Sequence, residues 1–255
     1  MEELTTLSPE ITESQEINQL SSEIPRIEIN PRTIRFSEAP WYIPKIPVLI
    51  GGAGGIGSWL SLYLARQDLD IYIYDFDSLD ETNLGGQWYQ TNQLNLPKTS
   101  ALSQNIKSFT GNDINVYDRY DENSMGNPIV FSAFDNMEAR KVMFDKWEKD
   151  YALNPKYFNK ACVFIDGRLL AESGKVFTVT RHNASKYREY LYTDAEIKEQ
   201  PCSFKATSHA AGIIAGLMTA SFNNYTTNVK EGMLIRETPF LTEFELPLMT
   251  FENTN

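Results

Sequence analysis

The stretch that decides the fold runs from residue 46 to residue 77 and reads IPVLIGGAGGIGSWLSLYLARQDLDIYIYDFD. The apolar run at 46–50 predicts a short strand in the centre of a parallel sheet. The glycines that follow predict a tight turn into a helix over 55–67, and residues 70–74 predict the next strand. This order of elements is typical of a βαβ unit whose helix N-terminus attracts anionic groups.

Strands and helices continue to alternate up to residue 170, which predicts a Rossmann-like, doubly wound α/β sheet that is mostly parallel. Such a sheet binds ligands beyond the carboxyl ends of its strands. After a turn near residue 173, residues 174–180 alternate in the β manner and predict an antiparallel strand towards the C-terminus. The remaining predicted strands are 114–117, 128–131 and 163–166, and the remaining predicted helices are 98–110, 137–147 and 206–222.

The composition of the chain changes at both ends. Residues 1–30 are rich in Ser, Thr and Glu and predict a mobile acidic arm. Residues 31–226 form the predicted main domain, onto which an ordered, extended segment at 31–45 packs. Residues 227–255 are expected to form an extended C-terminal segment that packs on this domain or on a partner. A polar segment at 181–205 is expected to be irregular.

Net charge and apolar patterning exclude several classes of partner. The formal net charge of −11 disfavours nucleic acids and anionic membrane surfaces, because both would repel the chain. The longest apolar stretch, at 210–220, is too short to span a bilayer. We see no secretion signal at the N-terminus. A soluble cytoplasmic protein is therefore expected.

The cysteines and histidines offer little material for a metal centre. The chain has two of each, Cys162, Cys202, His182 and His209, and no CxxC pair. A disulfide framework and a structural zinc site are therefore not expected. Cys162 begins an apolar strand and is predicted to be a core residue. His209 is predicted to be buried or half-buried on a helix, and His182 is predicted to lie on the surface.

Four glycines of the turn point to a nucleotide. Gly52, Gly54, Gly55 and Gly57 would let the backbone approach phosphate groups. Asp75 ends the second strand, where an acid can bind ribose hydroxyls. A tight turn without a ligand is the plainer alternative. The same pattern also describes an NAD-dependent oxidoreductase, and the glycine spacing does not decide between the two.

The residues that follow favour a triphosphate. Asp77, Asn83 and Gln87 lie on or near the loop after the second strand, Lys98 opens a helix, and Asp135 follows a later strand. Lys98 would neutralise phosphate charge and Asp135 would hold Mg²⁺. Taken singly, Lys98 could be a solvated surface charge and Asp135 a helix N-cap. The ordered set is far less expected by chance.

Over residues 46–226 these motifs resemble the ThiF/MoeB family, the adenylating domain of ubiquitin-like-protein activating enzymes. The resemblance implies an ATP-dependent adenylyltransferase that uses Mg²⁺ and works as a homodimer. It would activate a carboxylate, the C-terminal Gly of a ubiquitin-like or sulfur-carrier protein, as an acyl-adenylate. It further implies that Arg35, or else Arg32, enters the ATP site of the partner subunit. The residues that carry the resemblance are Gly52, Gly54, Gly55, Gly57, Asp75, Asp77, Asn83, Leu84, Gln87, Lys98, Asp135, Asn136 and Arg140.

One departure from the family pattern bears on activity. Gly86 replaces the arginine that precedes the family glutamine and contacts the phosphates. Loss of one such preorganised charge commonly costs about 10²–10³ in rate. Another cation could substitute, and the candidates are Arg35, Arg119, Arg140 and Arg168. Otherwise the enzyme would be slow or inactive, which keeps open a nucleotide-binding or assembly protein of the same fold.

Residues 201–210, PCSFKATSHA, resemble the Pro-x-Cys-Thr segment in which activating enzymes carry a thioester-forming cysteine. Cys202 lies just before a predicted helix, where a thiol pKa falls and the thiolate is favoured. We therefore treat Cys202 as a candidate acceptor of the activated acyl group. The alternative is a packing cysteine at a loop–helix junction.

Overall fold

The computed structural model describes residues 30–158, 160–191 and 207–255. The predicted acidic arm, apart from Asn30, lies outside the described residues, and so does Cys202. Among the described residues, none of the helices combines the length and the apolar character that a bilayer span requires.

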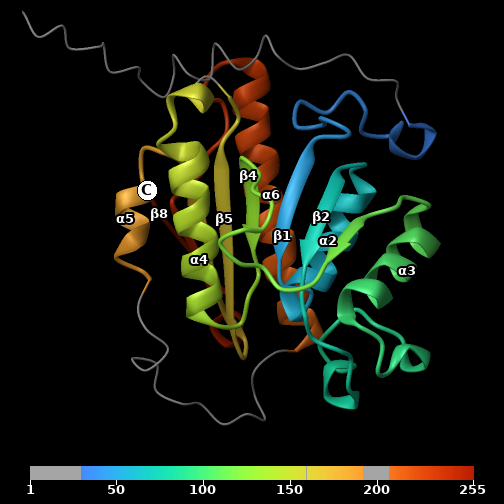
Figure 1. Cartoon of the computed structure of the whole chain (residues 1–255). Helices are drawn as coiled ribbons and strands as arrows, with labels where there is room; N and C mark the ends of the chain where they lie inside the picture. The colour runs from blue at the N-terminus through green and yellow to red at the C-terminus, as the bar shows by residue number, and fades with distance from the viewer. Residues whose placement is uncertain (1–29, 159, 192–206) are drawn as a thin grey trace, which may run out of the picture.

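The described residues form one mixed sheet of eight strands in the order β3-β2-β1-β4-β5-β6-β7-β8 (Figure 1). The first five strands in this order are parallel, and each later neighbour pairs antiparallel. This arrangement confirms the predicted fold class. The strands are β1 (Pro47–Gly51), β2 (Asp70–Tyr74), β3 (Asn115–Tyr117), β4 (Ile129–Ser132), β5 (Val163–Leu170), β6 (Ser173–Val179), β7 (Leu241–Glu245) and β8 (Thr250–Thr254).

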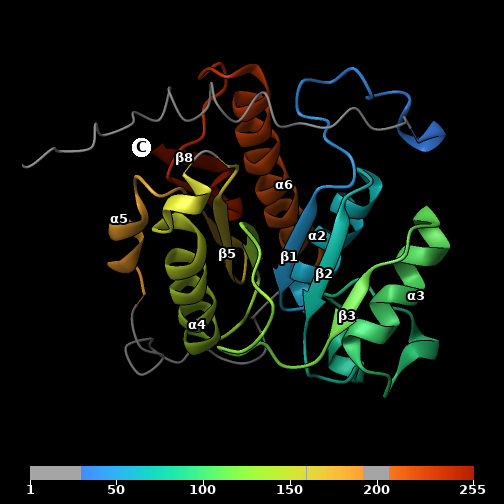
Figure 2. The same ribbon diagram turned by 45° about the horizontal axis from the view of Figure 1, so that its top comes forward.

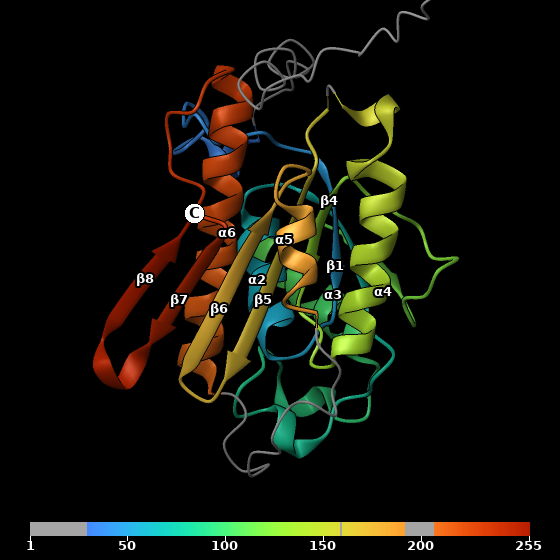
Figure 3. The same cartoon turned by 90° about the vertical axis from the view of Figure 1, so that its left-hand side faces the viewer.

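Helices cover both faces of the sheet, and Figure 3 shows α4 and α6 on opposite sides of it. One face carries α2 (Gly55–Arg66), α3 (Lys98–Thr110) and α6 (Ser208–Glu231), and the other carries α4 (Met137–Trp147) and α5 (Ala184–Arg188). The short turns are 3₁₀ helices η2 (Pro31–Thr33), η3 (Glu81–Asn83), η4 (Thr91–Gln93), η6 (Pro155–Tyr157) and η9 (Leu246–Leu248), and a π turn η5 (Glu148–Ala152).

Strand alternation divides the core in two. In β1, Val48 and Ile50 face the α2 side while Leu49 faces the α4 side, and all three are fully buried. Side chains of successive strand residues point to opposite faces, so a central strand needs an apolar residue at every position. The apolar run at 46–50 therefore indicates that β1 is a central strand, buried on both faces of the sheet.

Several elements differ from their prediction. Helix α6 continues to Glu231 and ends at Gly232, whose φ of +67° suits glycine. Strand β5 runs on to Leu170, because it pairs with β6 from Phe164 to Leu170. Helix α5 lies in the segment expected to be irregular. On α3, Leu102 and Ile106 are buried as predicted, but Phe109 is 55% exposed.

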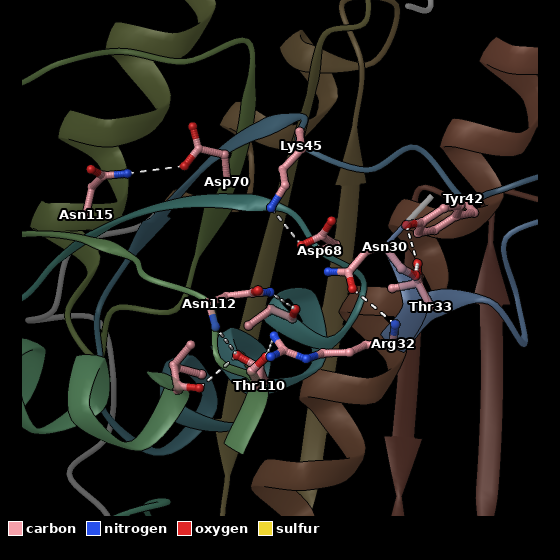
Figure 4. Close-up of polar contacts among 12 residues, drawn as sticks. Asn30, Arg32, Thr33, Tyr42, Lys45, Asp68, Asp70, Thr110, Asn112 and Asn115 are labelled. Carbon is pink, nitrogen blue, oxygen red and sulfur yellow. Dashed lines mark hydrogen bonds and ion pairs between the residues drawn. The ribbon is translucent and has the colours of Figure 1, made fainter. Parts of the chain in front are cut away.

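Residues 30–45 pack on the domain as predicted, but through a 3₁₀ turn rather than as an extended segment. The Thr33 and Tyr42 hydroxyls lie 2.5 Å apart and both side chains are buried. Arg32 donates to the carbonyl of Thr110, and Lys45 pairs with Asp68 at 2.7 Å (Figure 4). Thr110 ends α3 and Asp68 precedes β2, so this segment lies at the amino edge of the parallel strands.

Candidate nucleotide site

The glycine turn lies at the carboxyl edge of the sheet, where β1 and β4 are neighbours and Gly51 is in register with Ser132. From β1 the chain moves through α2 to β2 and β3 on one side, and it returns to β4 on the other side. This is a topological switch point, where open α/β sheets bind ligands. Figure 2 shows the loops that gather below the ends of β1, β2 and β3.

The glycines of the turn differ in whether the fold leaves room for a side chain at their position. Gly52 has a φ of +93°, and a Cβ there would lie 2.7 Å from the Ala133 carbonyl oxygen. A Cβ on Gly57 would lie 1.8 Å from the Gly52 carbonyl oxygen. A Cβ on Gly54 would meet nothing within 4 Å. Gly52 and Gly57 are therefore required by the fold itself, whereas Gly54 faces open space at the N-terminus of α2.

Asp75 is tied to the turn rather than extended towards solvent. Its Oδ2 accepts the Ala53 N–H at 2.7 Å, and its Oδ1 accepts the Asp77 N–H at 2.8 Å. Burial raises the pKa of the Asp75 carboxyl, and these two hydrogen bonds partly offset that rise. Each carboxylate oxygen has a further lone pair, so bonds to ribose hydroxyls remain available.

Lys98 and Asp77 form an ion pair beside the turn. The Lys98 ammonium lies 2.7 Å from Asp77 Oδ2, and the Lys98 N–H donates to the Asp77 carbonyl at 2.8 Å. The Lys98 side chain is 9% exposed and that of Asp77 is 46% exposed. The alternative of Lys98 as a solvated surface charge is therefore wrong. The fold holds a cation at the carboxyl edge and leaves its partner open to solvent.

The loop after β2 brings in the amide residues. Asn83 completes a capping box with Asp80, whose N–H donates to Asn83 Oδ1 at 3.1 Å. Gln87 follows, and within the described residues its Oε1 atom is buried without a hydrogen-bond partner. A buried acceptor without a donor costs free energy, so its oxygen is suited to a group that arrives from outside.

Asn136, not Asp135, caps helix α4. Its side-chain oxygen accepts the Ala139 N–H at 2.8 Å, and its amide donates to Asp135 Oδ1 at 3.3 Å. Asp135 is exposed at the same edge as the turn. The described residues contain no group of three or more His, Cys, Asp or Glu side chains arranged for a metal. One carboxylate fits a Mg²⁺ ion that takes its other ligands from substrate phosphates and water.

Two of the four candidate arginines are engaged in a buried cluster. Arg140 and Arg168 both pair with Asp166, and the Tyr187 hydroxyl donates to the same carboxylate at 2.8 Å. Burial alone would raise the pKa of Asp166, but the two guanidinium groups outweigh it and the pKa lies below its ordinary value. Arg140 also donates to the Phe134 carbonyl, so the cluster fixes the backbone that leads into Asp135.

The other two candidates lie at opposite edges of the sheet. Arg119 follows β3, and its guanidinium carbon lies 3.7 Å from the ring centre of Phe76, between Asp75 and Asp77 in sequence. Arg35 is exposed in the segment at the amino edge. Arg119 therefore lies on the loop side of β2 that carries Asp75 and Asp77, whereas Arg35 lies at the opposite edge. Arg32 is committed to the Thr110 carbonyl.

The cysteine and histidine predictions had mixed outcomes. Cys162 is buried, which confirms its place in the core. His182 is exposed, as predicted. The prediction for His209 was wrong: its side chain is 58% exposed and lies 3.4 Å from Glu172. It faces outwards from the first turn of α6, while Ala210 and Ala211 make the buried contacts.

Concavity alone does not mark the candidate site. A hollow of about 430 Å³, open solvent included, lies at the amino end of β5 beside Cys162 and Tyr225. None of the predicted nucleotide-site residues lines it. We place the site by its residues, because a glycine turn, a cation and exposed carboxylates converge at the other edge.

Tyr89 lies against the glycine turn, which sequence reasoning missed. Its hydroxyl donates to the Ala53 carbonyl at 2.6 Å. A tyrosine two residues after Gln87 matches no nucleotide motif. Only the folded loop brings it against the glycine turn, 36 residues earlier in the chain.

Comparisons with known proteins agree with the fold and identify a family. A sequence model of the ThiF family matches residues 42–255. Among solved structures, E. coli MccB with ATP has a TM-score of 0.61 at 14% identity, covering 91% of this chain and 73% of MccB. E. coli MccB with MccA-N7isoAsn has a TM-score of 0.61 at 12% identity, covering 90% and 72%. PaaA has a TM-score of 0.61 at 14% identity, covering 98% and 76%.

Proposed function

The chain belongs to the ThiF family of adenylating enzymes, and we propose that it activates a carboxylate of a small protein or peptide with ATP and Mg²⁺. The observation that carries the proposal is the buried Lys98, paired with Asp77 and close enough to offset part of the burial-driven rise in the pKa of Asp75, whose carboxylate accepts the Ala53 N–H of the glycine turn. A buried cation next to a helix N-terminus suits the phosphates of a nucleotide.

In the proposed reaction the ribose binds at Asp75 and the phosphates lie over the glycine turn. One oxygen of the substrate carboxylate attacks the α-phosphorus, the bond to the bridging oxygen breaks, and pyrophosphate leaves with that electron pair. Lys98 and the backbone N–H groups of α2 stabilise the negative charge that develops. Asp135 and the phosphates would hold Mg²⁺. Gln87 and Asn83 would contact the nucleotide from the loop.

Arg119 is the proposed substitute for the arginine that Gly86 replaces. Arg140 and Arg168 are occupied by Asp166, which leaves Arg119 as the candidate at the carboxyl edge of the same chain. Arg35 would add a second cation from the partner subunit of a homodimer. With neither arginine in place, the chain would bind nucleotide and assemble without catalysing adenylation.

The proposed substrate is the C-terminal Gly of a ubiquitin-like or sulfur-carrier protein. A peptide carboxyl group is the second candidate, because E. coli MccB, which this chain resembles in fold, has been solved together with MccA. Cys202 would accept the acyl group from the adenylate as a thioester, releasing AMP. The charge of −11 makes a nucleic-acid substrate unfavourable.

Two measurements test the proposal. ATP with Mg²⁺ should raise the melting temperature of the chain, and NAD should not. With a carrier protein ending in Gly-Gly, or a peptide with a free carboxyl terminus, the chain should exchange labelled pyrophosphate into ATP. Stabilisation by NAD alone would favour an oxidoreductase. ATP binding without exchange, whatever substrate is offered, would favour a non-catalytic nucleotide-binding protein.

A further inference from the structure

Resting on the proposed function, we propose that Tyr89 is a positioning residue that sets the direction in which the Gly54 N–H points, and thereby the affinity for the phosphates of the nucleotide. The Tyr89 hydroxyl donates to the Ala53 carbonyl oxygen at 2.6 Å. The peptide group that contains this carbonyl also contains the Gly54 N–H.

The geometry of that peptide group fixes where the Gly54 N–H points. In a trans peptide the C=O and N–H bonds point to opposite sides, and the described residues contain no cis peptide bond. With the Ala53 carbonyl held towards Tyr89, the Gly54 N–H points away from Tyr89. Gly54 is also the residue whose missing Cβ leaves open space. We infer that this N–H, at the entrance to α2, donates to a phosphate oxygen of the nucleotide.

The neighbouring peptide group is fixed independently. The Ala53 N–H is taken by Asp75 Oδ2 at 2.7 Å. The groups on both sides of Ala53 are thus held by side chains from the loops after β2, one by a carboxylate and one by a phenol. Gly54 tolerates either sign of φ, so without Tyr89 the peptide between Ala53 and Gly54 could flip at little cost. A flipped peptide would present its carbonyl oxygen to the phosphates.

Tyr89 itself is held in place by its own segment. The Trp59 indole donates to the Gly86 carbonyl at 3.2 Å, and the Trp88 N–H donates to the Ser58 hydroxyl at 3.0 Å. Both contacts join residues 86–89 to the first turns of α2. Behind this segment Asn105 donates to the Trp88 carbonyl at 3.1 Å. Burial, and after it the nearby Asp75 carboxylate, raise the pKa of Tyr89 well above its ordinary value, so the hydroxyl keeps its proton.

The test compares ligands with and without phosphates. Tyr89→Phe removes the hydroxyl and keeps the ring, so the melting temperature should fall only by about 2–4 °C for each kcal/mol that the lost hydrogen bond costs. By calorimetric titration with Mg²⁺ present, the Kd for ATP should rise about 3- to 10-fold, the usual worth of one hydrogen bond. The Kd for adenosine, which has no phosphate, should change less than about 2-fold on the same grounds.

Tyr72→Phe is the matched control, because it removes a tyrosine hydroxyl that donates to Asp70 at 3.2 Å, at the amino end of β2. It should leave both affinities unchanged. An unchanged ATP affinity in Tyr89→Phe would overturn the inference alone, as would an equal loss for ATP and adenosine. A wild-type chain that binds neither ligand would overturn the proposed function as well.

Discussion

Lys98 is the first helical residue of α3, and its ammonium group is buried beside the half-exposed Asp77 carboxylate. An ion pair with one hydrated partner contributes little to stability, because solvent screens the exposed charge. The arrangement is better explained by function: Asp77 can remain hydrated while the cation turns to a phosphate. The sequence placed Lys98 at a helix start, but its partner is 21 residues away and became visible only in the fold.

At this scale we predict that Lys98→Ala lowers pyrophosphate exchange about 10²- to 10³-fold, the usual effect of removing one preorganised charge. Lys107→Ala is the control, since it removes an exposed lysine of the same helix that pairs with Asp113. Circular dichroism should show both variants folded. Equal exchange rates in the two variants would remove Lys98 from the mechanism.

In the glycine turn, Gly57 is needed by the fold, whereas Gly54 is expected to matter for nucleotide binding. Gly57→Ala forces a Cβ to within 1.8 Å of a backbone oxygen that cannot rotate away. We expect it to lower the free energy of unfolding by about 3 kcal/mol or more, at the upper end of the cost of overpacking. Gly54→Ala places its Cβ in open space and should leave the unfolding midpoint in urea nearly unchanged.

For ATP affinity the expectation is reversed: Gly54→Ala is the variant that should change it most. Gly54→Ala puts a methyl group where the phosphates are expected, so its ATP affinity should fall at least 10-fold, a steric cost of about 1.4 kcal/mol. Urea unfolding and calorimetric titration measure the two effects. A Gly54→Ala chain that binds ATP as tightly as the wild type would place the phosphates elsewhere.

The elements that the sequence predicted well are those with long, continuous local signals. Helix α3 has its predicted bounds, and β1 is shifted by one residue. Helix α5 was missed because it has five residues, too few for a periodic pattern. The length of β5 depends on its pairing with β6, and Phe109 lies against the Trp88 ring of a distant loop while staying exposed. Such features are set by contacts between distant segments, which periodicity does not report.

At the scale of the whole molecule, the sheet separates the two proposed cationic contributions. Lys98 and Arg119 lie at the carboxyl edge, and Arg35 lies in the segment packed at the amino edge. One chain cannot bring Arg35 to its own glycine turn without unfolding that segment. A contribution from Arg35 therefore requires a second copy of the chain.

This separation predicts complementation between two variants that are each weakened at the proposed site. In a homodimer, Arg35→Ala and Lys98→Ala each damage every site, but a mixed dimer contains one complete site. Random reassortment makes about half of the dimers mixed, so about a quarter of the wild-type exchange should return. Light scattering should show dimers at the assay concentration. Monomers, or no recovery after mixing, would exclude the contribution in trans.

The most direct measurement is a crystal structure of the chain with Mg²⁺ and a non-hydrolysable ATP analogue. We expect the triphosphate over the glycine turn, with the Gly54 N–H and the Lys98 ammonium within hydrogen-bond distance of phosphate oxygens and Asp135 on the metal. A triphosphate bound away from Gly54 and Lys98, with Lys98 still turned to Asp77, would contradict the assignment of this edge as an adenylation site.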